Sequence, residues 1–180
     1  SLLVLTIFLS INDNIFLNNT GVVIYFVNND SSSNADYNWF GNNATNYDIE
    51  PITNNAEMST WLFLNATANP DAIIILGSFD IVFKLYAYNS SEVSEYDNGR
   101  LKAVRLTLTP TNGRVNTTRV ELGEPVHYTA EGAGIGTLTA SIEDATYTTT
   151  LKIIYSIVGY SSIKPTILFG VSFMILLSRL

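Results

Sequence analysis

The chain has 180 residues, enough for one domain with a sizeable core, and 47% of them are apolar while only 14% are charged. The net charge of −7 and the scattered positions of the nine basic residues argue against nucleic acid as a partner, because no Lys/Arg cluster could neutralise phosphates. The absence of cysteine excludes disulfides, thiolate metal sites and a thiol nucleophile.

The chain opens with an uncharged apolar segment, residues 1–11, whose alternation predicts a buried strand. One face of that strand would carry only aliphatic side chains: Leu3, Leu5, Ile7, Leu9 and Ile11. The segment is shorter than the roughly 20 apolar residues of a membrane-spanning helix, and no basic residue precedes it. Three interpretations stay open, namely a strand of its own domain, a strand donated to a neighbour and a residual signal peptide.

The following apolar stretches are typical of β-strands, because they are rich in β-branched and aromatic residues and are bounded by turn signals. Strands are expected at residues 21–27, 58–66, 80–88, 101–109, 114–122, 125–130, 137–142 and 145–160. Residues 72–76 could be helix or strand, and residues 96–99 and 110–113 are turn-like. In the long polar region 28–56 we expect either a short strand near residues 47–52 or a surface excursion fixed by its aromatic side chains.

The last apolar segment, residues 165–180, separates large side chains from small and polar ones with a period of two. Its large-residue face would carry Ile167, Phe169, Val171, Phe173 and Ile175. This separation favours a strand, and the competing interpretation is a C-terminal membrane helix, for which about 15 residues is short. Together these patterns predict an all-β, immunoglobulin-like sandwich.

No motif of the sequence indicates catalysis or a cofactor. His127 is the single histidine and has no nucleophile-elbow motif near it. The stretch Gly132–Gly136 lacks the helix and the Lys-Ser/Thr of a phosphate loop, so a turn is expected there. Glu143 and Asp144 could hold a cation, although a solvated turn is the simpler interpretation. We therefore expect neither an enzyme nor a cofactor or metal site.

Acceptor motifs for N-linked glycans are the most informative short pattern. They occur at Asn18, Asn29, Asn43, Asn65, Asn89 and Asn116. No asparagine of any kind follows Asn116. A glycan must point into solvent, so a final third without acceptors is consistent with a core or a seam between subunits. We expect several of these sites to carry glycans.

An apolar N-terminal strand, a cysteine-free β-domain, many glycan acceptors and an apolar C-terminal strand together resemble the donor-strand pilins. The architecture is most similar to the archaeal thread type, a glycosylated filament that resembles bacterial type I pilins in fold. The resemblance implies a pilin-like sandwich that lacks one strand and is completed by the N-terminal strand of the next subunit. It implies a donor tail at residues 1–12, a head at residues 13–180, and an acceptor groove formed by the last strand and the long strand before it.

The expected function is that of a structural subunit of an extracellular cell-surface filament, serving adhesion or biofilm formation. Its partners would be identical subunits joined head to tail, with no nucleic acid and no membrane contact in the assembled form. Two alternatives stay open: a surface glycoprotein anchored by a C-terminal membrane helix, and a viral coat or tail subunit. Donation by the C-terminal strand instead of the N-terminal one is also open.

Overall fold

The chain folds as an all-β sandwich of two curled sheets, which confirms the predicted fold class. A computed structural model describes residues 10–18, 24–25, 34–41, 53–54, 58–67, 72–89, 91–97 and 99–155. The helical content of these ranges is one 3₁₀ turn, η1 (Gly99–Leu101). Among the described residues, no helix is long and apolar enough to cross a membrane.

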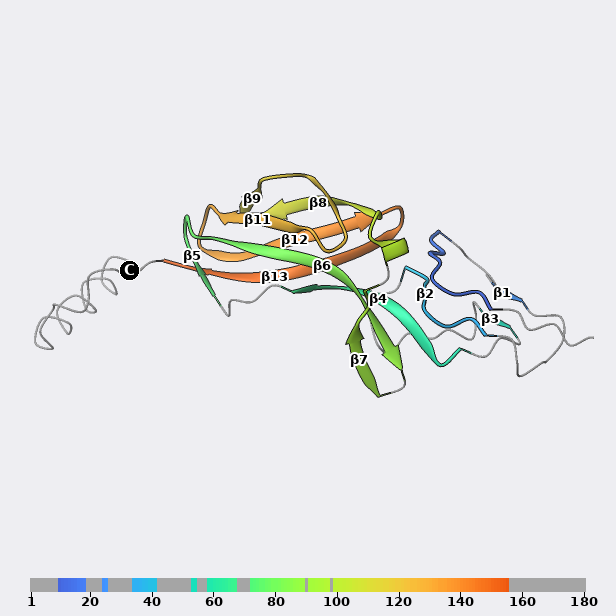
Figure 1. The fold of residues 1–180 in the computed structure, drawn as a ribbon. Helices are drawn as coiled ribbons and strands as arrows, with labels where there is room; N and C mark the ends of the chain where they lie inside the picture. The colour runs from blue at the N-terminus through green and yellow to red at the C-terminus, as the bar shows by residue number, and fades with distance from the viewer. Residues whose placement is uncertain are drawn as a thin grey trace, which may run out of the picture.

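The first sheet has five strands in the order β10-β8-β12-β13-β5. Its strands are β5 (Ile73–Ile74), β8 (Arg105–Thr111), β10 (Arg119–Glu121), β12 (Gly134–Ile142) and β13 (Ala145–Ile154). β12 and β13 form a long antiparallel hairpin, while β5 pairs with the end of β13 in parallel. Figure 1 shows these strands along the length of the molecule.

The second sheet packs against the first and has the order β2-β4-β6-β11-β9, with β7 added beside β6. Its strands are β2 (Asn38–Trp39), β4 (Thr60–Thr67), β6 (Ser78–Asn89), β7 (Glu92–Glu95), β9 (Gly113–Val115) and β11 (Pro125–Ala130). A separate parallel pair joins β1 (Ile24–Tyr25) to β3 (Thr53–Asn54).

Alternation along the strands builds the main core between the sheets. In β6, the side chains of Ile81, Phe83 and Leu85 are buried, and the residues between them are more exposed. β12 contributes Leu138 and Ala140 to the same core in the same way. Because the period is two in both strands, each sheet turns one apolar face inward.

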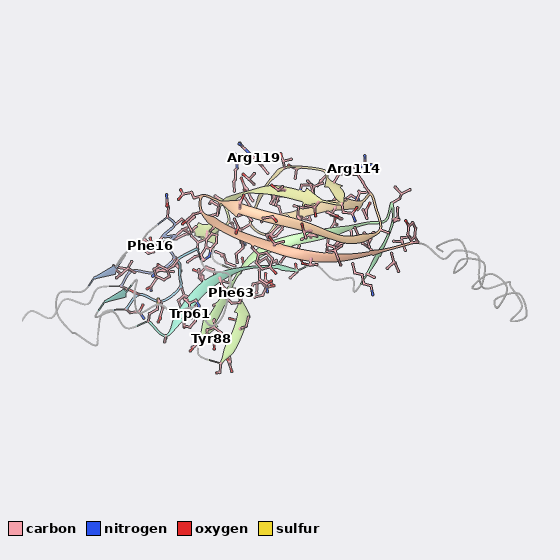
Figure 2. All side chains as sticks on the ribbon, turned by 180° about the vertical axis from the view of Figure 1, so that it is seen from behind. Phe16, Trp61, Phe63, Tyr88, Arg114 and Arg119 are labelled. Carbon is pink, nitrogen blue, oxygen red and sulfur yellow. The ribbon has the colours of Figure 1, made fainter. Side chains whose placement is uncertain are left out.

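Aromatic pairs brace the outer face of the second sheet between β4 and β6. Trp61 contacts Tyr88 edge to face, with ring centroids 4.8 Å apart, and Phe63 lies 5.9 Å from Tyr86. Figure 2 shows Trp61, Phe63 and Tyr88 grouped on this part of the sheet. These pairs add to the ladder between the strands and hold β4 in place.

Residues 10–18 form an additional layer beside residues 34–41 rather than a free tail. Phe16 N–H donates to the Trp39 carbonyl (2.8 Å), and Trp39 N–H donates to the Asn14 carbonyl (2.9 Å). The buried Asn38 accepts from Asn14 N–H (3.0 Å) and donates to the Ile11 carbonyl (2.5 Å). A second apolar cluster lies in this layer and contains Ile11, Phe16, Ile24, Ala35, Phe40 and Met58.

Two sequence-based expectations about chain direction were wrong. The expected strand 114–122 is two strands, β9 and β10, which belong to different sheets. The hairpin turn expected at residues 96–99 does not join two paired strands, since β7 before it and β8 after it lie in different sheets. The real hairpin partner of β6 is β7, which the sequence analysis missed. In each case the pairing is decided by distant residues, which a local turn signal does not report.

The two ends of the described chain lie at opposite ends of the molecule. Ser10 belongs to the layer at one end, and Tyr155 follows β13 at the other (Figure 1). The layer touches the sandwich through the Asn18 N–H, which donates to Asp144 Oδ1 (3.0 Å). The molecule is therefore elongated, with distinct N-terminal and C-terminal ends.

Candidate assembly edge

β13 has an outer edge that lacks a partner over most of its length. Its inner side pairs with β12 from Ala145 to Ile153, and its outer side pairs with β5 at Ile153 and Ile154. Within the described residues, no strand lies on that outer side between Ala145 and Lys152. An unpaired edge of this length is a template for another strand.

The groups that face this outer edge follow from the pairing with β5. Ile75 N–H donates to the Ile154 carbonyl (2.9 Å), so the backbone of Ile154 faces outward. Since successive residues of a strand alternate, the N–H and C=O groups of Thr148, Thr150 and Lys152 face the same way. An added strand would find three residues with both backbone groups turned toward it.

The neighbouring edge of the second sheet is open as well. β4 pairs with β6 along its whole length, but its other side pairs with β2 only at Trp61 and Leu62. In the part of the chain that the structure describes, no strand lies beside the stretch from Phe63 to Thr67 on that side. We call the outer edges of β4 and β13 together the open seam.

A tyrosine bridges the open seam. Tyr147 Oη donates to Asn65 Oδ1 (2.6 Å), which joins β13 to β4. The ring of Tyr147 stands edge-on to the buried Phe83, with centroids 6.3 Å apart. Tyr147 is only partly buried. The core is therefore covered here by a half-buried ring and one side-chain hydrogen bond, without a ladder of backbone hydrogen bonds.

Both ends of the open seam are defined. At one end, Asp144 in the β12–β13 turn accepts the hydrogen bond from Asn18, which brings the N-terminal layer against the turn. At the other end, β5 occupies the β13 edge. Between them, the stretch from Tyr147 to Lys152 has six residues, or roughly 20 Å of strand. This length suits one short added strand.

Of the five predicted donor residues, only Ile11 lies within the described residues, which begin at Ser10. Ile11 lies in its own chain, where its N–H donates to the Asn34 carbonyl (2.9 Å) and its side chain packs in the second apolar cluster. The other four, Leu3, Leu5, Ile7 and Leu9, lie outside the described residues. In the donor hypothesis the donated segment therefore ends before Ser10.

The predicted acceptor residues Ile167, Phe169, Val171, Phe173 and Ile175 also lie outside the described residues. The long strand before them, expected to help form the groove, is described as β13 and carries the open edge. The sequence analysis missed which stretch of β13 is unpaired.

The predicted glycan acceptors differ in their surroundings. Asn18, Asn89 and Asn116 are exposed, so each has room for a glycan. Asn65 is partly buried and its side-chain oxygen accepts from Tyr147 at the open seam. Asn29 and Asn43 lie outside the described ranges. A glycan on Asn65 would occupy the seam, whereas glycans on the three exposed sites would leave it accessible.

The remaining candidates for chemistry lie on exposed surfaces. His127 Nδ1 contacts Asp80 Oδ1 at 3.0 Å, and both side chains are more than half exposed. The nearby Ser78 hydroxyl is hydrogen-bonded to Thr129 Oγ1 (2.9 Å). Nucleophilic catalysis would require such a hydroxyl on the histidine ring. Among the described residues, the hydrogen bonds that involve side chains join His127 to Asp80 and to Asn116, and none joins its ring to a hydroxyl group.

Glu143 and Asp144 lie in the exposed β12–β13 turn, as the solvated-turn interpretation expects. Gly134 begins β12, so the stretch Gly132–Gly136 leads from a turn into a strand. Among the described residues, no group of three His, Cys, Asp or Glu side chains is placed to hold a metal ion.

A cavity of about 500 Å³ lies between the β6–β7 hairpin and the β10–β11 turn. Two ion pairs lie in its lining, with Lys84 Nζ 2.5 Å from Glu95 Oε1 and Lys102 Nζ 2.5 Å from Asp97 Oδ1. The hydrogen bond to Glu95 raises the pKa of Lys84, and the hydrogen bond from Lys102 lowers the pKa of Asp97. These are exposed ion pairs, which are common on protein surfaces.

Comparison with known proteins gives no match to a family model, a curated protein or a solved structure. The described residues form a β-sandwich with an open seam along β4 and β13. Any functional interpretation of this chain therefore rests on the geometry of that seam and of the two ends of the molecule.

Proposed function

We propose that this chain is a structural subunit of an extracellular filament in which copies are joined by strand addition at the outer edge of β13. The observation that carries the proposal is the stretch of β13 from Tyr147 to Lys152, which has no strand on its outer side among the described residues and is bounded at both ends. Natural β-proteins usually cover, shorten or charge such an edge. Here two of the exposed positions of this stretch are threonine, at 148 and 150, which do not oppose pairing.

The proposed occupant is the apolar segment of residues 1–9 of a second copy. Nine residues span roughly 30 Å in a strand, which is enough for the open seam. The row Leu3, Leu5, Ile7 and Leu9 would pack against the half-buried ring of Tyr147, while main-chain hydrogen bonds form with β13. Each aliphatic side chain that becomes fully buried would contribute about 1.5–3 kcal/mol to the free energy of association. This is an upper bound, because Tyr147 already covers the core and the added side chains would be buried only in part.

The positions of the two ends make growth open-ended. The donated segment precedes Ser10 at one end of the molecule, and the accepting edge belongs to the strand that leads to the other end (Figure 1). A contact between two different surfaces forms a ring only if the rotation between successive copies adds up to a full turn. Otherwise each copy leaves one surface of each kind free, and the copies form a helical filament. The partners are identical copies, and the exposed Asn18, Asn89 and Asn116 would carry N-linked glycans on the outside.

The experiment that tests this proposal is electron microscopy of the purified chain with Ile7→Asp. A charge on the inward row should leave folded heads that do not polymerise, because the carboxylate would have to be buried against Tyr147. Thr6→Asp is the matched control, since it places the same charge on the opposite face of the segment. Intact filaments of Ile7→Asp, or equal loss with Thr6→Asp, would contradict the proposal.

A second candidate function is a surface glycoprotein anchored by its C-terminal segment. One observation favours it, namely the exposed apolar side chains gathered where the described chain ends at Tyr155. This candidate predicts monomers that require detergent, whereas the filament proposal predicts polymers without it.

A further inference from the structure

Five of the seven exposed large apolar side chains of the described residues lie at one end of the sandwich. We call them the apolar tip, and they are Ile74, Leu76, Ile135, Ile154 and Tyr155. Ile154 pairs with Ile74, and Ile135 pairs with Lys152 two positions earlier in β13, so Ile74, Ile154 and Ile135 lie on the same outer face of three adjacent strands. Figure 1 shows β5, the start of β12 and the end of β13 at this end.

Leu76 is the most informative member of the apolar tip. It is 76% exposed, and its φ of 64° lies in the left-handed region. A leucine at such a position is disfavoured both by backbone sterics and by exposure of its side chain, and asparagine or glycine would relieve both. Leu76 thus has both a strained backbone and an exposed apolar side chain when the chain is alone. This combination indicates that the side chain is covered by something outside the chain.

From this arrangement we infer that the apolar tip contacts a lipid bilayer surface. Two observations favour lipid over a second copy. The chain continues directly from the tip into residues 156–180, which include the apolar stretch 165–180. The tip is also flanked by the exposed Lys152, although the whole chain has a net charge of −7. Tyrosine and lysine beside aliphatic side chains are the composition of membrane interfaces.

This inference deepens the second candidate function and does not require strand exchange at β13. It adds a specific contact to simple anchoring, because the sandwich would rest on the bilayer through its end. The second sheet's β7 hairpin, with the exposed Val93, lies away from the tip and would remain in water (Figure 1).

The test uses the full chain with single cysteines, which are unambiguous because the chain has none of its own. Leu76→Cys and Val93→Cys are labelled with an environment-sensitive fluorophore and mixed with vesicles of equal parts phosphatidylcholine and phosphatidylglycerol that carry a nitroxide lipid. Both sites are exposed apolar positions, so Val93 is the matched control. Strong quenching at position 76 and weak quenching at position 93 is the expected result.

Each other outcome overturns the inference in a distinguishable way. A chain that binds the vesicles without quenching at position 76 would be anchored but have a free tip. A chain that does not bind vesicles would contradict anchoring as well. Shielding of position 76 that depends on protein concentration and not on lipid would assign the tip to a second copy.

A second variant separates contact from folding. Leu76→Asn relieves the left-handed backbone, so it should keep or raise the melting temperature. It should nevertheless reduce quenching of a fluorophore at Ile135→Cys, because the apolar tip loses its most exposed side chain. Unchanged quenching at position 135 would contradict a contact made through the tip.

Discussion

The two lateral sides of the sandwich are closed by different means. On one side, β8 continues through Asn112 into β9 and so passes from the first sheet to the second. There the fully buried Tyr128 donates its hydroxyl to the Thr111 carbonyl (2.8 Å). On the other side, the half-buried Tyr147 donates to a side chain, Asn65, between two strands whose outer edges are only partly paired among the described residues.

The difference shows that a closed core does not require a closed sheet. Both sides bury the same core, which includes Phe83 and Leu138 at 0% exposure. On the side with the covalent crossing, a buried side chain bonds to a backbone carbonyl of the chain, whereas the seam leaves outward groups of β13 to solvent or to a partner. Stability and assembly should therefore respond to substitutions on opposite sides of the molecule.

The largest expected effect is on assembly. Thr150→Pro removes an outward-facing N–H of β13 and should abolish polymerisation, while the ladder to β12 retains its hydrogen bonds. Light scattering of the purified chain measures the effect. Arg119→Pro, at an edge position of β10 on the closed side, is the matched control and should still polymerise. Polymerisation of the Thr150 variant would contradict the claim that assembly uses the β13 edge and not the β10 edge.

The next largest effect is on stability and belongs to the closed side. Leu106 in β8 is fully buried, so Leu106→Ala should lower the free energy of unfolding by about 2–5 kcal/mol. Urea denaturation of unassembled protein measures it. A loss below about 1 kcal/mol would mean that the core near β8 is less tightly packed than the burial of Leu106 indicates.

The closed side should also make the folding stability depend on pH. Burial raises the pKa of Tyr128 above its ordinary value of 10.0. The unfolded chain therefore ionises first, and stability is lost as the pH rises from 10 through the higher folded pKa. Tyr128→Phe should remove this component and cost about 1–3 kcal/mol at neutral pH, because the Thr111 carbonyl loses a buried donor. Denaturation series at neutral and alkaline pH test both statements, and an unchanged alkaline slope would contradict the assignment to Tyr128.

The smallest effect is expected at the open seam. Tyr147→Phe removes the hydrogen bond to Asn65 but keeps the ring against Phe83, so it should cost only about 0.5–1.5 kcal/mol. Comparing urea midpoints of Tyr147→Phe and Tyr128→Phe tests the ranking. A larger loss at position 147 would show that the seam is held more strongly than the closed side.

The sequence predicted the fold class and the positions of several strands better than their partners. Strands were expected at residues 80–88 and 137–142, where β6 and β12 lie, because strand patterns are local. Residues 114–122 look like one strand, yet they divide between two sheets, since only distant partners decide the crossing. The open seam could not be predicted from the sequence. Whether an edge is paired depends on how all the described strands are arranged, and no local pattern in β13 or β4 reports that arrangement.

The same reason explains the outcome for the N-terminal segment. Its apolar alternation predicted a buried strand, and the structure describes only the end of the segment, where Ile11 lies in its own chain. The hydrogen bonds from Asn38 and to Asn34 that hold this end join residues more than twenty positions apart. Donation by residues 1–9 therefore remains our proposal, with Ile11 as the point where the segment joins its own head.

Residue-resolved amide hydrogen exchange, recorded on unassembled and on assembled chain, tests the strand-addition account most directly. The account predicts that the amides of Thr148, Thr150 and Lys152 exchange rapidly before assembly and become protected by about a hundredfold or more afterwards, because they enter a new ladder. The amides of Thr149 and Leu151, which face β12, should be protected in both states. Rapid exchange at Thr148 and Thr150 in the assembled material, or failure of the chain to assemble at all, would contradict the account.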